Sequence, residues 1–179
     1  MLQIILPEIR SFDERTEEFI TLSPVTLKLE HSLISLHKWE SKWHKSYLHS
    51  QNLSSEEVLD YIRCMSLDPN LDVKVLDRLT QSNLKQIEEY VHNPMTATTF
   101  NVKDRKRDKT IITAEVLYYY MINFGIPFEC AKWHLNQLFA LIQVCSLKNA
   151  PSKKTNKKET AANWAALNKA RRARTGSRG

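Results

Sequence analysis

The net charge of this chain changes sign near residue 148, and the change divides it into two parts of different physical character. Residues 148–179 contain ten Lys and Arg and a single acid, Glu159, so their net charge is +9. Because the whole chain carries +6, residues 1–147 carry −3. A terminal block of like charges is usually an interaction tail. The sequence therefore predicts a folded, slightly acidic domain at 1–147, followed by a basic linker and C-terminal helix at 148–179.

The acidic part is long enough to fold as one domain, because a chain of about 150 residues buries roughly two thirds of the surface that it exposes when unfolded. The three cysteines are far apart and form no CxxC pair, which argues against a disulfide framework and a zinc ribbon. No run of 18 apolar residues and no signal peptide pattern occur, so we expect no membrane span and a reduced, cytosolic protein. With only three glycines, a glycine-rich phosphate loop is excluded.

The first thirty residues favour β structure. Short runs rich in β-branched and aliphatic residues occupy 2–6, 18–22 and 25–30, with a predicted turn at 11–16 and a break at Ser23-Pro24. We expect these runs to form a small antiparallel hairpin or a three-stranded sheet within residues 1–30.

From residue 32 onward, apolar side chains recur at helical spacing. Ser54 and Glu57 have the spacing of a capping box, in which each side chain bonds the backbone N–H of the other residue. The four helices predicted in this stretch cover residues 32–47, 55–67, 72–79 and 83–91, the last with Ser82 as its N-cap. Residues 96–112 then alternate β-branched and charged stretches, which indicates either a hairpin with a solvated tip or a loop.

The most apolar stretch of the chain covers residues 114–124 and 128–147. Between them, Gly125 suits the left-handed position after a helix and Pro127 suits the first turn of the next helix. We therefore expect an αα-hairpin that forms the core or a subunit interface, because apolar residues lie nearly all round both helices. The earlier side chains expected to pack against it are Leu33, Leu36, Trp43, Leu59 and Ile62.

The predicted fold class is accordingly α+β and mostly α. It combines a small N-terminal antiparallel sheet, a helical body with a central αα-hairpin, and a basic C-terminal helical arm.

Two sets of residues have spacings that resemble chemical sites. His37, Glu40 and His44 could share one face of a helix, but interleaved lysines would repel a cation and the HExxH pattern is absent. Cys130 and His134 have the spacing of a thiolate–imidazole pair, but a nucleophile needs access to solvent and this stretch is strongly apolar. We interpret the first set as a solvated helix face and the second as core packing, and we predict no enzyme, no metal site and no cofactor.

The basic segment has three interpretations. Residues 159–174 have high helix propensity, but their apolar stripe around Trp164 is thin and such a helix is marginal alone. The cations could contact nucleic acid, could fold against an acidic protein surface, or could have no binding role. The candidate partner-binding residues of the whole chain are aromatic or cationic: Trp39, Trp43, Tyr119, Trp133, Trp164, Lys169, Arg171, Arg172 and Arg174.

Two strings of this sequence are distinctive: WESKW, within residues 29–48, and PFECxxWHLN, within residues 112–154. Together with residues 95–100 and 163–174, they resemble the tail assembly chaperones of long-tailed phages, or siphoviruses, of Gram-positive and especially actinobacterial hosts. The resemblance implies a late viral, non-enzymatic helper that binds the tape-measure protein in the host cytoplasm and is absent from the mature virion. The tail tube protein and a second copy of the chain are further candidate partners.

The physical pattern agrees with this resemblance. A long helical tape-measure protein exposes apolar stripes before the tail tube surrounds it, and masking them requires a partner with an apolar groove and a soluble exterior. The function predicted from the sequence is thus that of a phage tail assembly chaperone. The alternative is a nucleic-acid-binding or structural virion protein that uses the basic arm.

Overall fold

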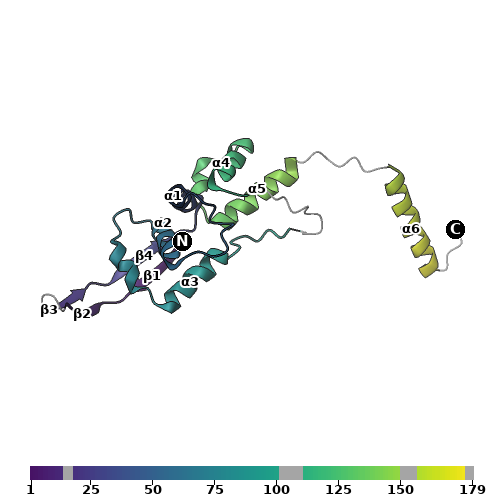
Figure 1. Ribbon diagram of the computed structural model, residues 1–179. Coiled ribbons are helices and arrows are strands. Elements are labelled where there is room, and N and C mark those ends of the chain that lie inside the picture. The colour runs from purple at the N-terminus through teal and green to yellow at the C-terminus, as the bar shows by residue number, and fades with distance from the viewer. Residues whose placement is uncertain (14–17, 101–110, 150–156, 176–179) are drawn as a thin grey trace. The chain divides into compact units, whose positions relative to one another are not determined.

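The computed structural model describes residues 1–13, 18–100, 111–149 and 157–175. The chain divides into two compact units, Met1–Ser146 and Leu147–Gly179. The first unit is mostly helical with antiparallel strands near its N-terminus (Figure 1), which confirms the predicted α+β, mostly α fold class. Within the described ranges, no helix is both long enough and apolar enough to cross a membrane.

The strands form an antiparallel ribbon that is interrupted in the middle. They are β1 (Leu2–Leu6), β2 (Ile9–Asp13), β3 (Glu18–Leu22) and β4 (Val25–Leu29). β1 pairs with β4 and β2 pairs with β3, and both pairs keep one common register. That register places Pro7 opposite Pro24, and neither proline has an N–H group to donate to the strand ladder. The interruption therefore coincides with the two prolines.

Arg78 holds the ribbon at this interruption. Its guanidinium donates hydrogen bonds to the carbonyl oxygen of Ser23, at 3.1 Å, and to that of Pro7. These bonds supply donors to backbone oxygens where the ladder lacks them.

The predicted turn at 11–16 is wrong for residues 11–13, which belong to β2. Residues 14–17 lie outside the described part of the chain. The polar residues of β2 resemble a turn in sequence, but pairing with β3 gives their backbone groups ladder partners, and this pairing overrides local propensity.

One face of the β1–β4 pair packs on the helical core. Ile4, Leu6 and Leu27 are buried, whereas Ile5 points to solvent. This alternation is that of an antiparallel sheet with one covered face.

Helices make up most of the remaining described chain. They are α1 (Leu33–Trp43), α2 (Ser55–Met65), the 3₁₀ helix η1 (Val73–Arg78), α3 (Gln81–His92), α4 (Ala114–Asn123), the 3₁₀ helix η3 (Phe128–Lys132), α5 (Leu135–Asn149) and α6 (Lys157–Thr175). The expected hairpin at 96–112 has no strand among residues 96–100 and 111–112, and residues 101–110 lie outside the described ranges.

Local capping signals set two helix starts. The capping box of Ser54 and Glu57 is confirmed, with the Ser54 N–H donating to the Glu57 carboxylate at 2.8 Å. α3, however, begins earlier than predicted. Thr80 rather than Ser82 is its N-cap, because Thr80 and Asn83 form their own capping box.

α1 ends one turn earlier than predicted. His44 takes a left-handed conformation with φ 53° and caps the helix. The buried Glu40 carboxylate then accepts the N–H of Tyr47 at 3.0 Å and the N–H of Ala114 at 2.7 Å. Burial raises the pKa of Glu40, and the two N–H donors oppose that rise. Glu40 thus ties the segment after α1 to the start of α4.

The second helix of the predicted αα-hairpin begins at Leu135 rather than at residue 128. Gly125 has the expected left-handed φ of 63°, but Pro127 is followed by the short η3. His134 then forms an isolated antiparallel bridge with Ser32, and the Leu135 N–H donates to the carbonyl of His31 at 2.7 Å. This contact with a distant segment interrupts the helix that local apolar spacing predicts.

The predicted core is largely confirmed. Leu33, Leu36 and Ile62 are buried, and Trp43 and Leu59 are half-buried against the same cluster. In the second unit, α6 covers the helix predicted at 159–174, and both Trp164 and Leu167 are exposed.

Replacing Leu138 with Ala should lower the free energy of unfolding by about 2 to 5 kcal/mol, because the side chain is fully buried and its loss leaves a cavity. The matched control is Leu147→Ala in the same helix, where the side chain is 62% exposed and the cost should stay within about 0.5 kcal/mol. Urea unfolding of both variants measures the difference. Equal costs would contradict this placement of the core.

Candidate partner-binding groove

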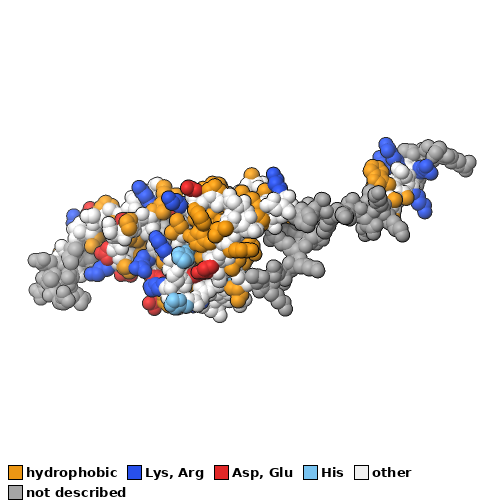
Figure 2. All heavy atoms as spheres, turned by 90° about the horizontal axis from the view of Figure 1, so that it is seen from above, with side chains coloured by type: hydrophobic (Ala, Val, Ile, Leu, Met, Phe, Trp, Pro, Cys, Tyr) orange, Lys and Arg blue, Asp and Glu red, His pale blue; other side chains and the backbone are white. Residues whose placement is uncertain are grey.

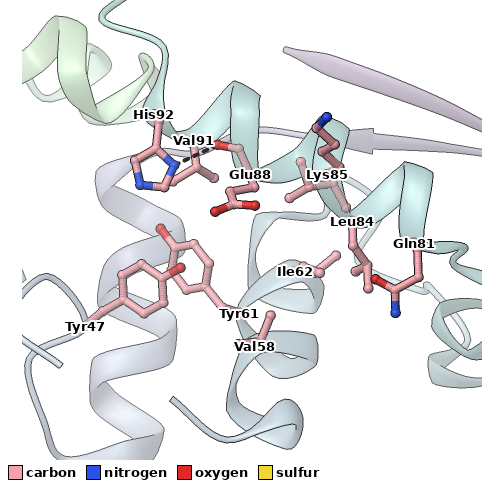
Figure 3. A pocket seen from close by; sticks show the side chains of 11 residues that line it. Tyr47, Val58, Tyr61, Ile62, Gln81, Leu84, Lys85, Glu88, Val91 and His92 are labelled. Carbon is pink, nitrogen blue, oxygen red and sulfur yellow. Dashed lines mark hydrogen bonds between the residues drawn. The ribbon is translucent and has the colours of Figure 1, made fainter. Parts of the chain in front are cut away.

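A groove of about 620 Å³ lies between α2 and α3 (Figure 3). Its lining residues come from these two helices and from the segment after α1: Tyr47, Val58, Tyr61, Ile62, Gln81, Leu84, Lys85, Ile87, Glu88, Val91 and His92. Each of the two helices begins at a capping box, so the starts of both walls are fixed by local hydrogen bonds.

The groove has an apolar floor and a polar rim. Tyr61, Ile62 and Ile87 are buried beneath it. Val58, at 38% exposure, forms part of its lip, one helical turn before Ile62. The polar rim comes mainly from α3. This composition is that of a surface that binds apolar side chains and orients them with a few polar groups.

A second hollow of about 670 Å³ adjoins the first. The two hollows share Tyr47, Glu88, Val91 and His92 among their lining residues. The second one adds the segment around residues 48–53 and the side chain of Asn136. Together they form one trough along α3, which we call the α2–α3 groove.

Aromatic rings support the groove from below. The Tyr47 ring stacks on Tyr61 with a centroid distance of 3.7 Å, and Trp39 lies edge-on to Tyr47 at 5.1 Å. The Trp39 Nε1–H donates to the carbonyl of Glu57 at 3.0 Å, which anchors this cluster to α2. Burial raises the pKa of Tyr47 to about 12, so its hydroxyl remains a neutral hydrogen-bonding group at neutral pH.

Two buried histidines lie behind these rings. The His31 Nδ1 is 2.7 Å from the Tyr61 hydroxyl, and the His31 ring meets that of His134 edge-on at 5.2 Å. Since a carbonyl can only accept, the His134 Nε2–H donates to Tyr90 O at 3.0 Å, and its Nδ1 accepts the Asn136 N–H. His134 is therefore neutral in this arrangement.

Burial also explains how both imidazoles titrate. Desolvation, with a smaller contribution from His134, lowers the pKa of His31 to about 3. Burial lowers the pKa of His134 too. Both rings therefore stay uncharged at neutral pH, and their nitrogens serve the structure through hydrogen bonds.

The structure does not bring together either of the two residue sets whose spacing resembles a chemical site, Cys130 with His134 and His37 with Glu40 and His44. Cys130 lies buried in η3 and His134 lies beyond its end, so the two do not share a helix. Both oxygens of Glu40 accept backbone N–H groups, whereas the His37 ring lies 4.0 Å from Glu115. In the part of the chain that the structure describes, no three metal-ligating side chains come together.

The partner-binding residues predicted from the sequence differ in where they lie and in how exposed they are. Trp39 is fully buried, so its placement among them was wrong: it supports the groove and does not reach its surface. Trp43 is half-buried, and its Nε1–H donates to the Asp60 carboxylate at 2.8 Å. Tyr119 and Trp133 are exposed, as are Ile122 and Phe128. Figure 2 looks down on the α4 side of this unit and shows apolar side chains gathered there.

The remaining predicted partner residues lie on α6, where their side chains are all exposed: Trp164, Lys169, Arg171, Arg172 and Arg174. The α2–α3 groove itself was missed from the sequence. Leu84 and Glu88 are one helical turn apart on α3, but only the packing of α3 beside α2 shows that they share a groove.

Comparison with family models found no match, and comparisons with curated proteins and with solved structures found no significant similarity.

The buried histidines predict a pH dependence of stability. His31 keeps a pKa near 3 when folded but regains its ordinary value of 6.5 when unfolded. The stability it contributes is therefore complete above about pH 6.5 and is lost as the pH falls toward 3. At pH 5 the loss should be about 2 kcal/mol relative to pH 7.5, with His134 adding to it.

Urea unfolding at pH 7.5 and pH 5 measures this loss. The variant His31→Asn should lose less on acidification, because an amide oxygen can accept from the Tyr61 hydroxyl but does not titrate in this range. Equal free energies of unfolding for the unaltered chain at both pH values would contradict the assignment.

Proposed function

We propose that this protein is a non-enzymatic binding protein that holds an amphipathic helix of a partner in the α2–α3 groove. The observation that carries the proposal is the groove itself, with its buried apolar floor and polar rim between two capped helices. We further propose that it acts as a tail assembly chaperone and that the partner helix belongs to a tape-measure protein. The resemblance of the WESKW and PFECxxWHLN strings supports this finer proposal.

The dimensions of the groove suit a helix. α3 has twelve residues, which correspond to about 18 Å of helix and about three turns. A helix laid along it would present apolar side chains at positions i, i+3 or i+4, and i+7. The two hollows along α3 offer separate places for such side chains.

The groove is also preformed, so a partner can bind without a rearrangement of its walls. Its floor residues belong to the hydrophobic core, and its walls start at fixed caps. A preformed site loses little conformational entropy on binding, so more of the apolar contact energy appears as affinity. The exposed cations of α6 are a second surface, and we propose that they contact an acidic partner.

Val58→Arg tests the groove function. The new charge would lie at the groove lip and be desolvated by a bound helix, which should weaken binding about tenfold or more. The matched control is Val73→Arg, because Val73 is 54% exposed on η1 and outside the groove. Each variant is co-expressed with the tape-measure protein. The amounts of tape-measure protein that are soluble and that co-purify are then compared between the two variants.

We expect the tape-measure protein to be soluble with the unaltered chain and with Val73→Arg, and to be largely insoluble with Val58→Arg. A tape-measure protein that is equally soluble without this chain would contradict the chaperone function. Equal recovery with both variants would show that the groove does not bind it.

The exposed cations of α6 keep nucleic acid as a second candidate partner. If six or more cations of the basic segment contact phosphates, affinity for DNA should fall by about three orders of magnitude between 50 and 200 mM salt. Fluorescence anisotropy with a labelled duplex measures this slope. Absence of binding at low salt would remove this candidate.

A further inference from the structure

One acidic side chain lies at the centre of the α2–α3 groove. Glu88 lines both hollows, and Figure 3 shows its carboxylate directed into the groove on the side of Tyr47 and Tyr61. Among the described residues, no ion pair or hydrogen bond reaches this carboxylate. The side chain is exposed on the rim of the groove, where a partner's side chain can reach it.

The other ionisable groups of the rim are engaged. The Lys85 ammonium lies 4.0 Å from Glu89, one turn farther along the same helix. The His92 Nδ1–H donates to the carbonyl of Glu88 at 2.8 Å. Glu88 is thus the lining carboxylate with which a partner's cation could pair, although a lysine and a histidine also line the groove.

We propose that the helix bound in the α2–α3 groove carries a Lys or Arg that faces Glu88, with apolar residues about one turn to either side. This inference rests on the proposed function, because it specifies the chemistry of the helix that the groove holds. Apolar side chains at i and i+7 would enter the two hollows, and the cation at i+3 or i+4 would lie between them on the same face. The groove would then select helices by charge as well as by apolar spacing.

Two designed peptides test the proposal with the full-length chain. Both are alanine-rich helices with leucines at i and i+7, and they differ only in Lys or Glu at position i+4. Their dissociation constants are measured by fluorescence anisotropy at low salt. Since a partly exposed ion pair contributes up to about 1 kcal/mol, the Lys peptide should bind about threefold to fivefold more tightly.

Variants of Glu88 separate its effect from the charge of the rest of the chain. The preference should vanish in Glu88→Gln and reverse in Glu88→Lys. It should persist in Glu56→Gln, a matched control on α2 whose side chain lines a different hollow. Glu56 and Glu88 are both exposed. Near-UV circular dichroism of each variant checks that the fold is retained.

The outcomes distinguish this inference from the function on which it rests. Binding that is weakened by Val58→Arg but shows no preference between Lys and Glu would overturn the inference and leave the groove function standing. Absence of binding by either peptide, or binding that Val58→Arg leaves unchanged, would overturn both.

Discussion

The α2–α3 groove depends on the contact between the buried His31 and His134 rings. His31 follows the β ribbon and bonds Tyr61 of α2, while His134 precedes α5 and bonds the backbone of Tyr90 in α3. The His31 carbonyl also accepts the N–H of Leu135. Both walls of the groove are thus attached to one pair of neutral imidazoles, which sets the position of α3 relative to α2.

The parts of this fold that could be predicted are those that local chemistry determines. The capping box at Ser54 and the left-handed Gly125 need only a few neighbouring residues, and both were predicted correctly. The early end of α1, the interruption before α5 and the strand β2 were not. In each of these cases the hydrogen bonds that decide the outcome join the element to residues outside it. The Glu40 carboxylate accepts the N–H groups of Tyr47 and Ala114, the segment at His31 and Ser32 contacts His134 and Leu135, and β3 pairs with β2.

The candidate site shows a further limit of sequence patterns. Trp39 and Val58 both lie on apolar stripes of their helices, but the tryptophan is buried beneath the groove and the valine forms its lip. Apolar spacing identifies the side of a helix that packs on the rest of the protein. It does not show how much of that side the neighbouring element covers, and so it does not show which apolar residues remain at the surface. Glu88 gave no signal at all, because a single glutamate on a helix is an ordinary surface residue until α2 and Tyr47 are placed across from it.

The same buried contacts that stabilise the fold also prepare the groove for binding. Tyr47 and Tyr61 are held by stacking and by His31, so their faces are fixed before any partner arrives. The entropic cost of forming a complex would then fall mainly on the partner, whose helix has to order. An apolar floor alone would accept many such helices, since apolar burial is not directional. The Glu88 carboxylate on the rim changes the selection, because a helix that covers it without supplying a cation would remove water from the carboxylate and leave its charge uncompensated.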